Sequence, residues 1–92
     1  MRALPRIRVE NMTSPNGNKI SNQFTIMTDQ GLYFQSYDTV IALKQDGKVY
    51  LDHNAWNYSR TTSKYRGIFL GETTKETEAK IKSGEYELVE LN

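Results

Sequence analysis

The sequence predicts an α+β fold: a small, mainly antiparallel β-sheet of about five to six strands, with one or two short helices in the C-terminal half. Two observations lead to this prediction. Short apolar segments with strand-like alternation fill the first half of the chain and are separated by turn-forming residues. The second half contains a helix start signal at Thr73 and a stop signal at Gly84. The chain contains no linker or low-complexity run, so residues 1–92 are predicted to form a single domain.

The first half of the chain is expected to form an antiparallel meander. Asn16-Gly17 is the strongest hairpin signal and Asp46-Gly47 is another, because glycine tolerates the positive φ angle of tight turns. The segment after Asp38 is nearly all apolar, which fits a central strand or a short buried helical turn. The predicted strands cover residues 6–10, 20–28, 32–37, 39–44 and 49–51.

A helix is predicted over residues 75–83 by signals at both of its ends. Thr73 and Glu76 have the spacing of a capping box, in which each side chain accepts a hydrogen bond from the backbone N–H of the other residue. Gly84 suits the left-handed position that follows many helices. The apolar face of this segment is thin, so we expect the helix to lie on the surface of the sheet.

Two further elements are predicted around this helix. A shorter helical turn is expected to begin at Thr61 or Thr62 and to end before Gly71. The final segment, residues 86–91, is expected to be an edge strand or to contain a bulge, because its alternation slips in the middle. An exposed edge there could pair with a second copy, so the sequence leaves the oligomeric state open.

Two tyrosines provide one candidate surface. Tyr33 and Tyr37 alternate with Phe34, so they are expected on the sheet face opposite to it. If no helix covers that face, the tyrosines are available to a partner; if the C-terminal helix packs there, they belong to the core. We expect the second arrangement, because a helix whose apolar residues are Ala79 and Ile81 needs large residues beneath it.

The amino-acid composition indicates a cellular compartment and shows how charge is distributed along the chain. The chain has no cysteine, which fits a reducing interior, and neither a membrane-spanning apolar run nor the apolar core of a signal peptide. A cytoplasmic protein without a membrane partner is therefore expected. The net charge is +1, but residues 1–71 carry nine basic against five acidic residues, whereas residues 72–92 carry three against six. This could give opposite fields on two faces, or simply scattered solvated charges.

Signals for catalysis and metal binding are weak. The sequence lacks the common nucleotide-binding, zinc-protease and serine-hydrolase motifs. His53 is the single histidine, and its neighbour Asp52 is expected to point to the opposite side of the strand. One histidine, no cysteine and scattered carboxylates do not make a metal-ligand cluster. We therefore predict a protein that is not an enzyme, with no catalytic residue, metal or cofactor.

Binding signals are stronger and lie in the stretch NYSRTTSKYRGIF at residues 57–69. Aromatic faces and cations together suit the bases and phosphates of nucleic acids, and the same residue types dominate protein interfaces. The alternative is that the aromatic residues pack in the core while the cations remain solvated. The candidate binding residues are Trp56, Tyr58, Arg60, Lys64, Tyr65 and Arg66.

Three motifs carry a resemblance. The patterns N-G-x-x-x-S-N-x-F (16–24), F-Q-S-Y (34–37) and Y-S-x-T-T-x-K-Y-R-x-x-F-L-G (58–71) resemble a family of small domains carried by bacteriophages and mobile elements. The resemblance covers residues 16–92 and brings no assigned chemistry or site residues. In size and in its lack of cysteine, the chain is also similar to phage anti-CRISPR proteins, which share no common motif.

The resemblance implies a phage-encoded, non-enzymatic inhibitor of host defence that acts in the cytoplasm of the host cell. Its expected partner is a host CRISPR effector complex, contacted through protein subunits or guide RNA, and its expected effect is to block access of target nucleic acid. The acidic residues expected to mimic phosphates there are Glu72, Glu76, Glu78, Glu85, Glu87 and Glu90. The alternative is a small phage nucleic-acid-binding accessory protein, against which the near-neutral net charge argues.

Overall fold

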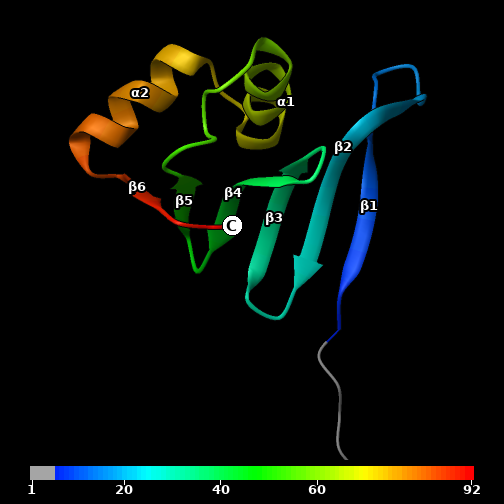
Figure 1. Cartoon of the computed structure of the whole chain (residues 1–92), viewed down its shortest axis with the longest axis horizontal. Coiled ribbons are helices and arrows are strands. Elements are labelled where there is room, and N and C mark those ends of the chain that lie inside the picture. Colours follow the sequence, from blue (N-terminus) through cyan, green and yellow to red (C-terminus); the bar gives the residue numbers. More distant parts are fainter. Residues whose placement is uncertain (1–5) are drawn as a thin grey trace, which may run out of the picture.

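The computed structural model describes residues 6–92, which form one six-stranded sheet and two helices (Figure 1). The elements are β1 (Arg8–Thr13), β2 (Lys19–Thr28), β3 (Gly31–Ser36), β4 (Thr39–Gln45), β5 (Lys48–Asp52), α1 (Arg60–Leu70), α2 (Thr74–Ser83) and β6 (Tyr86–Val89). The predicted α+β class, with a mainly antiparallel sheet and helices in the C-terminal half, is confirmed. Residues 1–5 belong to the predicted domain and to the N-terminal segment that was not expected to be a signal peptide, and they lie outside the described part.

The strands follow one another across the sheet in sequence order. Strands β1 to β5 are antiparallel neighbours, whereas β6 runs parallel to β5. A parallel neighbour requires a crossover connection, and α1 and α2 provide it. The main helix contacts are those of α1 with β3 and β4 and of α2 with β6. Figure 1 accordingly shows β1 and β2 extending away from the helices.

The predicted hairpin turns are present, although one is longer than its sequence suggests. Asp46 and Gly47 both have positive φ angles, 51° and 78°, as a two-residue turn between twisted strands requires. The loop between β1 and β2 is instead closed by hydrogen bonds from Ser14 N–H to the Asn18 carbonyl oxygen and from Gly17 N–H to the Ser14 carbonyl oxygen. Tight turns therefore set the register of the central hairpin, and a wider loop joins the two strands farthest from the helices.

One face of the sheet carries the core. Phe34 of β3, Ala42 of β4 and Leu51 of β5 lie beside one another in register, and all three are fully buried. Phe69 of α1 stacks on Phe34, with ring centres 5.6 Å apart. Ile41 is also fully buried, at the place where the pairing of β3 and β4 shifts. The helices therefore pack on the face that Phe34 occupies.

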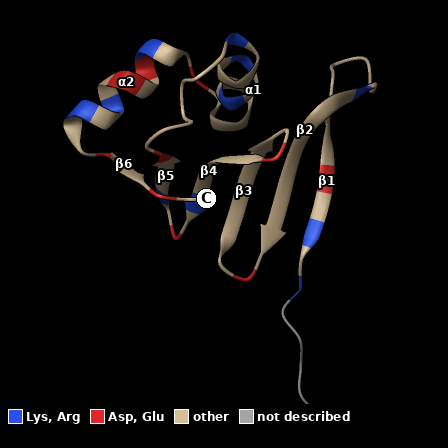
Figure 2. Ribbon diagram, in the orientation of Figure 1, with Lys and Arg blue, Asp and Glu red and all other residues tan. Residues whose placement is uncertain are grey.

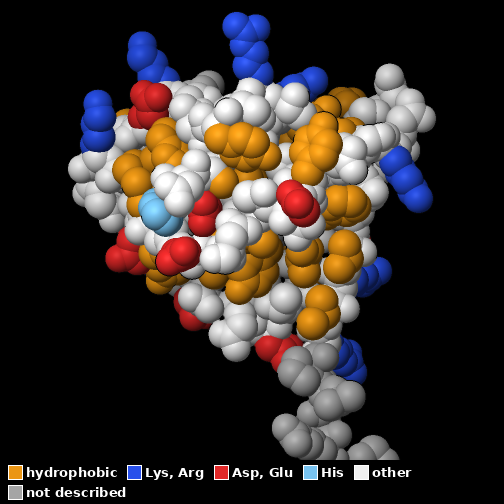
Figure 3. Space-filling model, viewed as in Figure 1, with side chains coloured by type: hydrophobic (Ala, Val, Ile, Leu, Met, Phe, Trp, Pro, Cys, Tyr) orange, Lys and Arg blue, Asp and Glu red, His pale blue; other side chains and the backbone are white. Residues whose placement is uncertain are grey.

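The opposite face of the sheet is not covered by the helices. Strand alternation places Tyr33 on this face, paired with Ile26 of β2 and Leu43 of β4. Figure 3 shows hydrophobic side chains spread over the sheet on the side turned to the reader. The prediction that the C-terminal helix covers Tyr33 and Tyr37 is therefore wrong, and Tyr37 is 52% exposed. The helices instead pack on the face that carries Phe34. The large apolar side chain in this contact is Phe69 of α1, whereas α2 has no residue of this kind.

Both helices end at predicted glycines, but the first begins earlier than expected. Around α2, Thr73 and Glu76 form both hydrogen bonds of the capping box, and Gly84 is left-handed, as predicted. The N-cap of α1 is Ser59, not Thr61 or Thr62, because the Ser59 hydroxyl accepts the Thr62 backbone N–H. Within residues 6–92, neither helix has the length and apolar character needed to cross a membrane.

The last strand is shorter than predicted, since β6 ends at Val89. The chain then leaves the sheet ladder and is held by side-chain hydrogen bonds. Asn92 accepts from the Val40 backbone N–H at 2.8 Å and donates to the Val40 carbonyl oxygen at 2.9 Å. These two bonds replace strand pairing and fix the C-terminus beside β4.

Candidate binding site

A turn held by Asp52 leads from the end of β5 toward α1. The buried Asp52 carboxylate accepts hydrogen bonds from the backbone N–H groups of Asn54 at 3.1 Å, Ala55 at 2.9 Å and Leu91 at 2.9 Å. Burial acts to raise the pKa of Asp52, but the hydrogen bonds, that from Leu91 above all, hold it below its ordinary value. The carboxylate thereby fastens the C-terminal segment to the loop that carries the candidate site.

The capping of α1 decides which side chains face outward. Because Ser59 is the N-cap, Arg60 is the first helical residue, and helical spacing places Arg60 and Lys64 on the same face. Thr62 and Arg66 lie on another face, turned to the sheet, and both are fully buried. The Thr62 hydroxyl donates to Ser36 Oγ at 3.1 Å and so fixes the helix over β3.

Arg66 points into the protein and joins three segments of the chain. Its guanidinium donates hydrogen bonds to the Trp56 carbonyl oxygen, to Asn57 Oδ1 at 3.3 Å and to Thr74 Oγ1 at 2.8 Å. The guanidinium also lies over the Trp56 ring, 5.1 Å from its centre. Burial lowers the pKa of Arg66, and Glu72 and Glu78 partly oppose that effect. The prediction of Arg66 as a surface contact is therefore corrected: its side chain has no exposed area.

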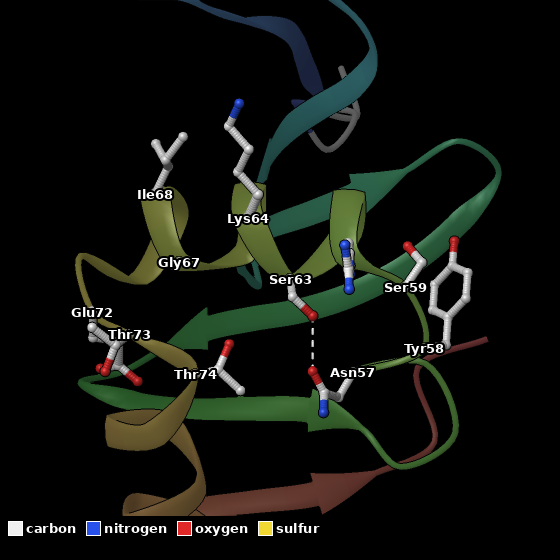
Figure 4. A pocket seen from close by; sticks show the side chains of 11 residues that line it. Asn57, Tyr58, Ser59, Ser63, Lys64, Gly67, Ile68, Glu72, Thr73 and Thr74 are labelled. Carbon is white, nitrogen blue, oxygen red and sulfur yellow. Dashed lines mark hydrogen bonds between the residues drawn. The ribbon is translucent and has the colours of Figure 1, made fainter.

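A groove of about 690 Å³ lies between α1, the preceding loop and the start of α2 (Figure 4). Figure 4 shows Tyr58 and Ser59 at one end, Ile68 at the other, and Asn57 and Ser63 hydrogen-bonded to each other at 2.8 Å. The lining residues are Asn57, Tyr58, Ser59, Arg60, Ser63, Lys64, Gly67, Ile68, Glu72, Thr73 and Thr74.

The groove combines accessible positive charge with hydroxyl groups. Arg60 and Lys64 are exposed, and among residues 6–92 neither forms an ion pair. Figure 2 shows basic residues on both helices and acidic residues at several turns of the sheet. A helix N-terminus also carries partial positive charge, and the groove includes residues at the starts of α1 and α2. The arrangement therefore favours an anionic ligand surface.

Glu72 is the single carboxylate among the lining residues, and its charge is already engaged. Its side chain is 4% exposed and accepts hydrogen bonds from Lys80 Nζ at 2.8 Å, Tyr86 Oη at 2.6 Å and Thr77 Oγ1 at 2.5 Å. Burial acts to raise the pKa of Glu72, but these three donors hold it below its ordinary value. Glu72 therefore links α2 to β6 and presents little negative charge to the groove, which also excludes it from the predicted phosphate-mimicking surface.

We predict that Glu72→Gln lowers the free energy of unfolding by about 2 kcal/mol at neutral pH, since hydrogen bonds to a charged group contribute more than neutral ones. The stability contributed by a carboxylate with a lowered folded-state pKa is present above its unfolded pKa, about 4.3 for Glu, and is lost as pH falls through the folded value. Urea denaturation at a series of pH values should therefore show that wild type and variant converge in acid.

Glu90→Gln is the matched control, because Glu90 is exposed. We expect this change to alter stability by less than about 0.5 kcal/mol at any pH. A pH dependence that Glu72→Gln leaves unchanged would contradict the role assigned to the Glu72 carboxylate.

The six predicted binding residues do not share one surface. Tyr58, Arg60 and Lys64 line the groove, and Tyr58 is 52% exposed. Trp56 and Tyr65 are partly buried and pack against the core, as the alternative interpretation anticipated for them. The sequence prediction missed the polar lining that Thr73 and Thr74 contribute from another segment, and it did not select Asn57 within its own stretch. The capping position of Thr73 was recognisable, but its place beside α1 depends on how the two helices pack.

A second hollow, of about 340 Å³, lies near the C-terminus and contains His53. The exposed His53 ring is 3.3 Å from the Asn54 amide nitrogen, while the Asp52 carboxylate is engaged by backbone N–H groups. Asp52 therefore does not orient the imidazole. Across residues 6–92, no three His, Cys, Asp or Glu side chains form a cluster that could hold a metal ion.

Comparison with known proteins places the chain in a family. The sequence profile of one protein family matches residues 7–86, which include all eleven groove residues. The chain belongs to DUF8033, a family of unknown function. No curated protein and no solved structure matches it.

Proposed function

We propose that this chain is a phage-encoded, non-enzymatic inhibitor of host defence that binds a CRISPR effector complex through the α1–α2 groove. Two separate observations support this proposal. The sequence resemblance to small phage domains suggests the class of partner. The groove supplies the chemistry, because Arg60 and Lys64 are exposed without ion pairs among residues 6–92, while the lining carboxylate, Glu72, is engaged elsewhere. That unbalanced positive charge is the observation that carries the proposal.

The charge of the groove favours a protein–RNA complex over free nucleic acid as the partner. Two cations that neutralise two phosphates of a single strand give a salt dependence with a log–log slope of only about −1.4. Proteins that are dedicated to nucleic-acid binding usually contact it with a larger number of basic residues. A short anionic contact of this kind is better suited to one part of a larger interface, such as exposed guide RNA beside protein subunits. Bound there, the domain would block access of target nucleic acid.

The alternative function, a small phage nucleic-acid-binding accessory protein, is favoured by one specific observation. Tyr58 stands at one end of the groove, whose lining also includes Arg60 and Lys64. An exposed aromatic ring beside cations is the arrangement that holds single-stranded bases and phosphates. A strong decrease in affinity with rising salt would support this alternative, whereas salt tolerance would favour a partner that includes protein.

A pull-down tests both functions. Tagged protein is incubated with bacterial lysate that contains active CRISPR complexes, with and without nuclease treatment. Recovery of effector subunits that resists nuclease supports the inhibitor proposal. Recovery of nucleic acid alone, lost on nuclease treatment, supports the alternative. Recovery of neither contradicts both.

The paired substitution Arg60→Ala with Lys64→Ala is expected to weaken that recovery at least about tenfold, because single interface arginines commonly contribute about 1–3 kcal/mol. The matched control is Lys19→Ala with Lys82→Ala, which removes the same charge from exposed positions outside the groove. Binding constants measured with the captured partner, together with unfolding curves for both variants, separate lost contact from lost structure. Equal weakening in both variants would show that net charge, and not the groove, drives binding.

A further inference from the structure

Strand β1 forms one edge of the sheet and leaves its outer side open. β1 pairs with β2, and within residues 6–92 no other strand pairs with it. Figure 1 shows β1 at the side of the sheet away from the helices. An open edge presents unpaired backbone N–H and C=O groups that can join another strand.

Around Val9, the side chains of this edge are apolar on one face and oppositely charged on the other. Ile7 and Val9 are 68% and 59% exposed, unusually open for residues of their type. Arg8 Nε lies 3.1 Å from Glu10 Oε1, and both side chains are more than half exposed. An ion pair this exposed contributes little to the stability of a single chain. The pattern is therefore not explained by the packing of the described residues.

We propose that β1 pairs with β1 of a second copy of this chain, antiparallel and centred on Val9. Strand geometry then places Arg8 of each copy directly opposite Glu10 of the other, so two cross-strand pairs of opposite charge form. The two Val9 side chains lie beside each other on the apolar face. A single two-fold axis thus pairs the open edge, the charges and the exposed Val9 side chains together.

Charge also selects this register over its neighbours. Moving the centre by one residue to Arg8 places two arginines opposite each other, and moving it to Glu10 places two glutamates opposite each other. Like charges directly opposite destabilise a strand pair. The Val9-centred register is therefore the one in which Arg8 and Glu10 both meet an opposite charge.

The other edge of the sheet is a poorer candidate for self-pairing. β6 has four residues, Tyr86–Val89, and is bordered or occupied by Glu85, Glu87 and Glu90. Pairing of two such strands centred on Glu87 would place two glutamates directly opposite each other. Pairing through β1 also avoids steric conflict, because the helices lie over the far part of the sheet (Figure 1). Two strands this short bury less area than a standard interface, so we expect a weak dimer that forms with rising concentration.

Charge exchange tests the register. Sedimentation velocity over a wide range of concentration should show a monomer–dimer equilibrium for the wild type. Arg8→Glu alone and Glu10→Arg alone should each weaken dimerisation roughly tenfold, since both symmetric pairs become repulsive. The double exchange should restore the wild-type behaviour, and a mixture of the two single variants should form a mixed dimer. Circular dichroism checks that every variant folds.

A cysteine scan gives an independent measurement, because the chain has no cysteine of its own. Directly opposed residues of an antiparallel pair have Cα atoms about 4.5–5.5 Å apart, within disulfide range. Val9→Cys should therefore cross-link rapidly under mild oxidation, and Leu88→Cys on the other edge should not. A wild type that stays monomeric at high concentration would overturn the proposal. So would dimerisation that is insensitive to the charge variants, or equal cross-linking at both positions.

Discussion

Replacing Arg66 with alanine is expected to lower the free energy of unfolding by about 3–5 kcal/mol, enough to unfold much of a small domain. Arg66 is the largest of the fully buried side chains, so its truncation leaves a cavity. It also removes the donor to the Trp56 carbonyl oxygen and to Thr74 Oγ1. The loop, α1 and the start of α2 would lose their common attachment. Urea denaturation followed by circular dichroism measures the effect.

Two comparisons make this expectation specific. Arg60→Ala removes the same side chain from an exposed position of the same helix, and should change stability by less than about 0.5 kcal/mol. Arg66→Lys keeps the charge, but one ammonium cannot reproduce a planar group that donates toward both Trp56 and Thr74, so we expect substantial destabilisation there too. If Arg66→Ala kept wild-type stability and lost only partner binding, Arg66 would be a surface contact after all.

The burial of Arg66 was predictable from the sequence once one helix residue had been assigned to the core. Thr62, Arg66 and Phe69 are the buried residues of α1, and they are spaced by four and three positions. This is the spacing of one helix face, so Phe69 indicates the inward direction for the other two. Composition alone suggested a basic, aromatic surface. Helical periodicity places Arg60 and Lys64 on the exposed face of α1 and Arg66 on the buried face.

Local signals predicted both ends of α2, the last residue of α1 and the central turn, because the causes of these features are local. The capping box at Thr73 and Glu76 and the turn at Asp46 and Gly47 each depend on a few adjacent residues. The face of the sheet that the helices cover depends on distant contacts. Both faces of β3 carry aromatic residues. The helices cover the face on which Phe69 stacks on Phe34.

The candidate groove was only partly predictable for the same reason. Tyr58, Arg60 and Lys64 are close in sequence, and their combination of cations and an aromatic ring was visible there. Thr73 and Thr74 complete the groove from the start of α2. Their position follows from the chain reversal at Gly71, which is left-handed and whose N–H donates to the Gly67 carbonyl oxygen. The sequence marked the break in the helix but not the direction of the next one.

Gly31→Ala is expected to lower the free energy of unfolding by at least about 3 kcal/mol, although it adds a single methyl group. Gly31 begins β3 with a φ angle of 151°, a conformation that residues with a Cβ rarely adopt. A Cβ there would lie 2.3 Å from the Lys44 carbonyl oxygen, which belongs to the backbone of the neighbouring strand β4. Neither the turn nor the strand can move without disturbing the pairing that holds Phe34 in place.

Gly47→Ala separates the two causes. Gly47 also has a positive φ angle, 78°, yet a methyl group added there would have no atom of residues 6–92 within 4 Å, apart from its own chain neighbours. Its replacement should cost only about 1–2 kcal/mol, the ordinary penalty of a left-handed non-glycine residue. Thermal or urea unfolding of both variants gives the comparison. If Gly31→Ala lowers the free energy of unfolding much more than Gly47→Ala does, the difference is due to the contact with β4. If both variants lose the same free energy of unfolding, β4 must shift to accommodate the methyl group. The hairpin between β3 and β4 would then be more flexible than its buried residues suggest.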